Sequence, residues 1–211
     1  MESAENSIFK KKLSSELSTA LEAAGIIEPT QLQQNTISRV KSGANCICIG
    51  PAGCGKSTSI LIGVIQSLKS ALNDVPRAII VVSDREKAIE LKERFNALVR
   101  QSELRVFCAI DGEKHEQQKD KIYAGSDVVI GTARRFNELY SNNGLNLAAL
   151  KMFVVDDGEL VIKNEVHSQI ERLAGGVGKA QWLVYGHTYT EKMQRFAENH
   201  MGLYEVIEVE E

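Results

Sequence analysis

The chain has 211 residues, of which 43% are hydrophobic and 25% are charged, and its formal net charge is −3. A chain of this length can bury a sizeable core, as one large domain or two small ones. Because there is no basic excess, any nucleic-acid partner must be bound by a local patch.

Targeting segments are not evident in the sequence. No apolar run reaches the ~18 residues that a membrane span needs. The opening residues, MESAENSIFKKK, lack the apolar segment of a signal peptide. We therefore expect an intracellular protein with no membrane partner, in the cytoplasm rather than the nucleus.

The four cysteines form neither a disulfide framework nor a metal site. Cys46 and Cys48 flank Ile47 in an apolar run, where a strand would point both thiols to the same face. Cys54 and Cys108 have no histidine or further cysteine at a metal-like spacing. Buried, reduced thiols are expected.

Two helical segments come first along the chain. Residues 13–25 end at a glycine cap, and residues 29–43 carry proline early in the first turn. Short apolar runs rich in β-branched residues then alternate with longer amphipathic segments. The expected strands are 45–50, 77–83, 104–110, 126–132, 151–156, 181–186 and 203–209. The clearest helices between them are 56–72 and 85–99.

Strands that read as continuous apolar runs are buried on both faces. With helices between them, they predict a doubly wound α/β fold, a mainly parallel sheet with helices on both faces. We expect one domain over residues 1–211, with a helical region at 1–43 and a core at 44–211. Ligands of such sheets bind at the carboxyl ends of the strands, so motifs at strand ends carry the most functional weight.

One complete motif lies between the first expected strand and the helix that follows it. GPAGCGKS, residues 50–57, fits the P-loop pattern G-x-x-x-x-G-K-[ST]. Its glycines let backbone amides face phosphate oxygens, Lys56 should reach the outer phosphates, and the Ser57 hydroxyl should ligate magnesium. The residues expected to contact nucleotide here are Gly50, Pro51, Ala52, Gly53, Cys54, Gly55, Lys56, Ser57 and Thr58. ATP and Mg²⁺ are the expected cofactors.

An acidic partner for the P-loop follows another strand. Asp156 comes at the end of MFVVD, where its carboxylate can hold magnesium through water. Asp157 is then placed to orient or deprotonate an attacking water. Lys56, Asp156 and Asp157 are the candidate catalytic residues, because phosphoryl transfer depends on positioning and charge stabilisation.

The order of these motifs resembles that of the first RecA-like domain of the DEAD-box RNA helicases, from about residue 8 to residue 209. GIIEPTQLQ, residues 25–33, is similar to the family's Q motif. The resemblance implies that Gln33 recognises the adenine edge and that Phe9 stacks on the base.

Three further segments stand where the family contacts RNA. SDREKA (83–88) stands at P-T-R-E-L-A, AIDG (109–112) at the paired glycines, and GTARRF (131–136) at T-P-G-R. The RNA-binding residues that the resemblance implies are Arg85, Glu86, Gly112, Thr132 and Arg135. Contacts from such loops follow backbone shape and not base sequence.

Other features of these segments leave the RNA contact open. Arginines at helix starts can also be solvated surface groups, a reading that applies to Arg85 and Arg135 taken singly. Asp84 replaces a family threonine and should repel RNA, whereas Arg134 replaces a family glycine and adds both charge and bulk.

Two motifs depart from the family on facing sides of one expected contact. DDGE, residues 156–159, stands at D-E-A-D, so Asp157 is one methylene shorter than the family's glutamate. A retraction of roughly 1 Å can cost on the order of 10²-fold in rate. Glu159, together with His187 and Thr188 of GHT at S-A-T, occupies the positions that couple nucleotide state to RNA. The changes are either compensatory or a sign of drift.

The resemblance also implies a second RecA-like domain, which this chain lacks and a longer protein would supply. Alone, the domain should bind nucleotide modestly and hydrolyse it poorly. We expect the amino-terminal ATP-binding domain of an RNA helicase. The alternatives are a degenerate scaffold that binds ATP or protein partners without unwinding, and an unrelated P-loop enzyme such as a small-molecule kinase.

Overall fold

The computed structural model describes residues 8–72, 74–100, 102–163 and 167–210. Residues 1–7 of the expected helical region, and Glu211, lie outside this part of the chain. The helices are α1 Ile8–Lys12, α2 Ser15–Ala23, α3 Gln31–Ser42, α4 Lys56–Leu68, α5 Arg85–Leu98, α6 His115–Tyr123, α7 Ala133–Ser141, α8 Gly158–Val161, α9 His167–Gly175 and α10 Glu191–His200. The strands are β1 Asn45–Ile49, β2 Ala78–Val82, β3 Val106–Ala109, β4 Val128–Thr132, β5 Met152–Val155, β6 Gln181–Gly186 and β7 Tyr204–Glu208.

All seven strands join one parallel sheet in the order β3-β4-β2-β5-β6-β1-β7. Strand β6 lies between β1 and β5, and the segments that follow the carboxyl ends of these three strands line one cavity. The predicted fold class, a doubly wound and mainly parallel α/β sheet, is confirmed.

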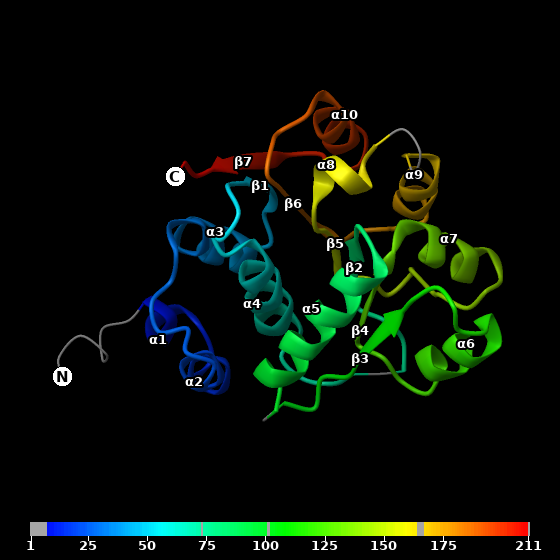
Figure 1. The fold of residues 1–211 in the computed structure, drawn as a ribbon, viewed down its shortest axis with the longest axis horizontal. Helices are drawn as coiled ribbons and strands as arrows, with labels where there is room; N and C mark the ends of the chain where they lie inside the picture. Colours follow the sequence, from blue (N-terminus) through cyan, green and yellow to red (C-terminus); the bar gives the residue numbers. More distant parts are fainter. Residues whose placement is uncertain (1–7, 73, 101, 164–166, 211) are drawn as a thin grey trace.

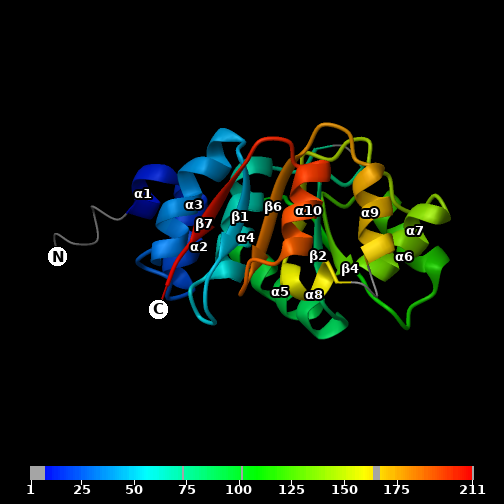
Figure 2. The ribbon, with the colours of Figure 1, turned by 90° about the horizontal axis from the view of Figure 1, so that it is seen from above.

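Helices cover both faces of the sheet, and in Figure 1 the sheet runs as a diagonal between the two helical layers. One apolar cluster packs under α2 to α5, and a second packs under α7 to α10. Side chains alternate between the clusters along each strand: Cys46 and Cys48 belong to the first, and Ile47 and Ile49 to the second. Figure 2 shows both helical layers from above.

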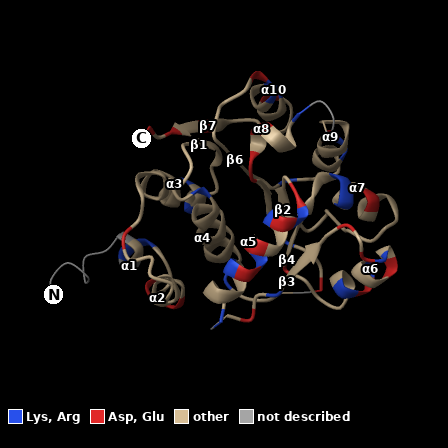
Figure 3. Cartoon of the chain, in the orientation of Figure 1, with Lys and Arg blue, Asp and Glu red and all other residues tan. Residues whose placement is uncertain are grey.

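Charged side chains are concentrated on the helices and loops, whereas strands β1 to β6 carry none (Figure 3). Strands without charges can be buried on both faces without the cost of desolvating an ion. The edge strand β7 differs, since it carries two charged residues, Glu205 and Glu208, both of which are exposed.

Local signals explain where the helices begin and end. Thr30 caps α3 with Gln33 in a reciprocal capping box, and Gly43 ends the helix in the left-handed region at φ 86°. Helix α4 ends at Leu68, earlier than expected, because Lys69 turns to φ 64°. Among the described residues, none of the helices has the length and apolar character to span a bilayer.

Candidate nucleotide site and RNA-facing groove

The P-loop leaves β1 at Ile49 and enters α4 at Lys56. Gly53 and Gly55 have φ of 81° and 93°, a region that side chains with a Cβ rarely adopt. No side chain caps α4, so its first backbone N–H groups are left for an anion. Lys56 is 8% exposed and its Nζ donates to the carbonyls of Gly50 and Pro51, at 2.6 and 2.8 Å. A phosphate would take over these ammonium contacts.

The Q-like segment, residues 25–33, is hydrogen-bonded to the P-loop. Thr30 Oγ1 donates to the carbonyl of Cys54 at 2.7 Å, and Gln33 Nε2 donates to the carbonyl of Gly55 at 3.2 Å. A Cβ at Gly55 would stand 2.4 Å from Gln33 Nε2, so the close approach requires glycine. The other end of the Gln33 amide accepts the Thr30 N–H. Gln33 therefore orients the loop, and its expected contact with adenine stays a prediction.

Phe9 lies in α1 and is only 1% exposed, inside the cluster under α2 to α5. Its ring is packed as a core side chain in this arrangement, so stacking on a base would require α1 to move. A separate cavity of about 420 Å³ borders the P-loop, between the start of α3 and the chain after β7. The lining residues are Thr30, Gln31, Leu32, Pro51, Ala52, Cys54, Val209 and Glu210.

Asp156 faces the P-loop from the carboxyl end of β5 and is 1% exposed. Its Oδ1 accepts the Asp157 N–H at 3.1 Å, while its Oδ2 has no hydrogen-bond donor among the described residues. Burial, and after it the charge of Asp157, raises the pKa of Asp156 from 3.8 to about 6. A buried carboxylate oxygen without a donor, opposite the Ser57 hydroxyl of the same cavity, suits a hydrated magnesium ion.

Asp157 has a left-handed backbone, with φ 52°. The Ser83 hydroxyl donates to its Oδ2 at 3.3 Å and is also 2.8 Å from Asp84 Oδ2. The residue expected to activate water is therefore tied to the segment after β2. This link joins the expected RNA-contacting loop to the nucleotide site through one hydroxyl.

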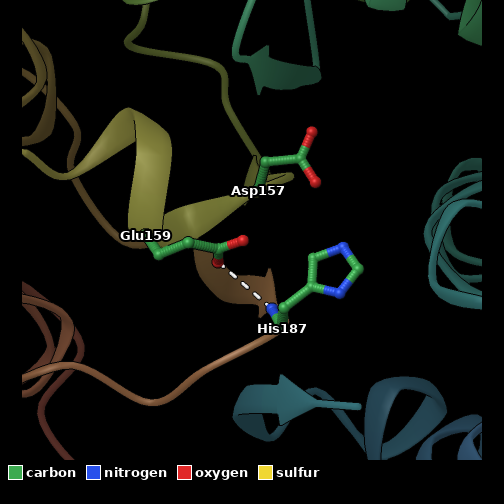
Figure 4. A group of neighbouring side chains, drawn as sticks. All are labelled: Asp157, Glu159 and His187. Carbon is green, nitrogen blue, oxygen red and sulfur yellow. Dashed lines mark hydrogen bonds between the residues drawn. The ribbon is translucent and has the colours of Figure 1, made fainter. Parts of the chain in front are cut away.

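The two departing motifs touch, as Figure 4 shows. Glu159 Oε2 accepts the N–H of His187 at 3.2 Å. A Cβ at Gly186 would lie 2.6 Å from the same Oε2, the far end of a flexible side chain, so the serine of the family motif would require the Glu159 carboxylate to shift. Gly186 lets the longer Glu159 side chain keep its present position, which fits the compensation alternative. Thr188 is exposed in the following bend.

His187 also reaches the P-loop, since its Nδ1 lies 3.5 Å from Lys56 Nζ. The side chains of Asp157, Glu159 and His187 bring possible ligand atoms within 4.8 Å of one another. The neighbouring ammonium of Lys56 would compete with a metal ion in this group. The contact between His187 and Lys56, the expected ligand of the outer phosphates, instead favours a role for His187 near those phosphates.

The nucleotide cavity has a volume of about 350 Å³. It is lined by Ala52, Gly53, Gly55, Lys56, Ser57, Thr58, Lys87, Arg94, Asp156, Asp157 and His187. Lys87 and Arg94, which both lie on α5, were not among the predicted site residues. Arg94 donates to Thr58 Oγ1 at 2.7 Å, and Lys87 Nζ lies 3.8 Å from Asp156 Oδ2. Because seven residues make about two helical turns, the spacing of Lys87 and Arg94 predicts that both side chains lie on one face of the helix.

The segments expected to contact RNA meet at a groove of about 530 Å³ beside this site. It is lined by Val82, Ser83, Asp84, Arg85, Asp111, Thr132, Ala133, Arg134, Leu160, Val161 and Lys163. Arg85 and Glu86 are exposed at the start of α5, and Gly112 is placed beside the Arg85 guanidinium. The groove carries three cations, Arg85, Arg134 and Lys163, against Asp84 and Asp111.

Arg135 points away from this groove and is 3% exposed. Its guanidinium donates to Gln118 Oε1, to the Glu113 carbonyl and to Glu138 Oε2, at 2.9, 2.7 and 3.0 Å. Thr132 Oγ1 accepts the Arg135 N–H and caps α7. Arg135 thus anchors the groove wall from inside, and its own contact with a phosphate has no support in this geometry.

Comparisons with known proteins agree with this arrangement. The family model described as DEAD/DEAH box helicase matches residues 30–196. The DEAD-box ATP-dependent RNA helicase CshB of Listeria monocytogenes is 24% identical over 86% of this chain and 42% of its own length. Nucleolar RNA helicase 2-A of Xenopus laevis is 28% identical over 91% of this chain and 26% of its own length.

A solved structure has the same fold. The crystal structure of a DEAD box protein from the hyperthermophile Methanococcus jannaschii superimposes with a TM-score of 0.87, at 22% identity, over 96% of this chain and 55% of that one. The chain thus spans about half or less of the relatives that it matches. With a family match that covers most of its length, the chain belongs to the DEAD/DEAH box helicase family.

Proposed function

We propose that this chain is the amino-terminal nucleotide-binding domain of an ATP-dependent RNA helicase, which binds ATP with magnesium and contacts the RNA backbone. One observation carries the nucleotide half of the proposal. The Lys56 ammonium, the start of α4 without a side-chain cap, and Asp156 Oδ2, which accepts no hydrogen bond from the described residues, converge on one cavity. A cation and unpaired amides suit polyphosphate, and the buried carboxylate suits its metal ion.

In this proposal the chain's own residues position the reaction. Lys56 and the α4 amides hold the outer phosphates, and Asp157 orients the attacking water through its free carboxylate oxygen. Ser57 and, through water, Asp156 would hold magnesium, which would supply charge neutralisation. A second RecA-like domain would complete the site from its open side.

The RNA half rests on the groove lined by Arg85, Thr132, Arg134 and Lys163. Its walls come from the segments at the carboxyl ends of four strands, β2, β3, β4 and β5. Exposed cations and the cap hydroxyl of α7 can take backbone phosphates without reading bases. Because the groove adjoins Ser83, which bonds Asp157, RNA contact and nucleotide state share one segment.

Nucleotide-dependent thermal stabilisation tests the first half. The wild type should gain stability with ATP and magnesium, and Lys56→Ala should lose that gain, because the buried ammonium is the principal phosphate ligand. Lys151→Ala, a change at an exposed lysine outside the cavity, is the matched control. An equal gain in Lys56→Ala would refute the P-loop assignment.

Binding of a single-stranded RNA, followed against salt, tests the second half. Arg85→Ala should weaken binding and lower the salt slope by about 0.7, the loss of one phosphate contact. Arg195→Ala on α10, whose side chain is 73% exposed, should leave both unchanged. Equal effects from the two variants would mean that the groove is not the RNA surface.

The scaffold reading is the second candidate, favoured by the shortened carboxylate of Asp157 and by its engagement with Ser83. RNA-stimulated ATPase of the full-length protein, with Asp157→Glu alongside, separates the two. Turnover by the wild type supports the helicase, and turnover only after Asp157→Glu supports an ATP-binding scaffold. Protein partners are then expected in place of RNA unwinding.

A further inference from the structure

Lys87 stands at a position where the family motif P-T-R-E-L-A has leucine. It is the third residue of α5, and its backbone N–H donates to Oδ1 of the cap Asp84 at 2.8 Å. That cap fixes the first turn of the helix, from which the side chain turns inward. Its Nζ lies 3.8 Å from Asp156 Oδ2, and the side chain is only 25% exposed.

The distance between these atoms leaves the hydrogen-bond donors of the Lys87 ammonium available to a ligand. At 3.8 Å the pair is attractive but longer than a hydrogen bond, and Oδ2 has no donor among the described residues. An ammonium has three donors. Lys87 can therefore balance the buried carboxylate and still donate to a phosphate oxygen or to a water that bridges to one.

The charge balance of the cavity depends on α5. Lys56, Lys87 and Arg94 line it with three positive charges, against two negative charges from Asp156 and Asp157. Without Lys87 and Arg94, one cation would face two carboxylates, and the cavity would repel a polyphosphate unless a metal ion came with it. With both, the cavity is positive before any metal ion enters.

We propose that the Lys87 ammonium lets this chain bind nucleoside di- and triphosphates with little dependence on magnesium, an inference that rests on the proposed nucleotide site. The ammonium lies 3.8 Å from Oδ2 of Asp156, which is also the oxygen that a hydrated magnesium ion would approach. It both lowers the need for the metal ion and competes with it. Asp84, another departure in this segment, caps the helical turn that carries Lys87.

The test is the affinity for ADP, measured by isothermal titration calorimetry in excess magnesium and again in excess EDTA. The wild type should lose less than about tenfold in affinity when magnesium is removed. Lys87→Leu, the leucine of the family motif, should bind ADP more weakly than the wild type under both conditions, and removing magnesium should cost it about fivefold more affinity than it costs the wild type, the effect of one partly exposed ion pair. Lys87→Arg should behave as the wild type.

Lys92→Leu is the matched control, since Lys92 lies on the same helix but outside the cavity. Unfolding temperatures of all variants without nucleotide show whether each is folded. If Lys87→Leu and the wild type lose affinity equally in EDTA, the inference is wrong while the nucleotide site stands. If the wild type binds ADP under neither condition, the proposed site itself fails, and the inference fails with it.

Discussion

Asp156→Asn tests whether the buried Asp156 carboxylate, which we expect to hold the metal ion of the nucleotide, destabilises the folded protein when no ligand is bound. The substitution preserves shape and keeps the Oδ1-type acceptor for the Asp157 N–H, but it removes the ionisable group. In the nucleotide-free protein the carboxylate is 1% exposed, and its Oδ2 accepts no hydrogen bond from the described residues, although the Lys87 ammonium lies 3.8 Å away. Its ionised form is therefore poorly solvated, which favours the protonated form in the folded state.

The sign and size of the effect follow from the pKa. Burial, then Asp157, raises the pKa of Asp156 in the fold from 3.8 to about 6. The group's contribution to the free energy of unfolding is complete below pH 3.8 and is lost as the pH rises through about 6. The full shift is worth about 3 kcal/mol, of which about 1.4 kcal/mol, one pKa unit, is lost between pH 5 and pH 8.

Urea unfolding of both proteins at pH 5 and pH 8, in EDTA and without nucleotide, measures the difference. All other titrating groups are shared and cancel. The stability of Asp156→Asn relative to the wild type should rise by about 1.4 kcal/mol from pH 5 to pH 8, or about 3–5 °C in Tm for a domain of this size. A relative stability that does not change with pH would refute the burial argument.

Further predictions concern particular contacts. Gly186→Ser should weaken nucleotide-dependent stabilisation because its Cβ would meet Glu159 at 2.6 Å, and adding Glu159→Asp should restore it; no recovery would contradict the steric fit. Asp127→Ala should cost about 3–5 kcal/mol in urea unfolding, because it strands the buried Arg77 guanidinium 2.6 Å away, whereas Asp74→Ala, at a side chain 70% exposed, should cost less than about 1 kcal/mol. Equal losses would mean that burial does not decide the value of these ion pairs. Single-turnover ATP hydrolysis should rise on the order of 10²-fold in Asp157→Glu, and an unchanged rate would show that the carboxylate's reach does not limit it.

The sequence alone was sufficient for the fold and for the position of the P-loop between β1 and α4. Apolar runs without charges, separated by amphipathic segments, can be buried only as strands of a sheet covered on both faces, and that is how β1 to β6 lie. The P-loop motif is local in the chain, so its backbone geometry follows from its own glycines. The ends of strands are likewise local features, which is why Asp156 could be recognised.

Contacts between segments far apart in the chain were decided only by tertiary structure. Arg135 lies in the motif that predicts an RNA contact, yet packing turns it inward onto α6, where Gln118 and the Glu113 carbonyl take its donors. Lys87 and Asp156 are separated by 69 positions and meet because β2 and β5 are neighbours in the sheet. Within one helix or strand, sequence spacing predicts the face on which a side chain lies. Which distant charge it meets depends on strand order and on burial, and these are properties of the folded chain as a whole.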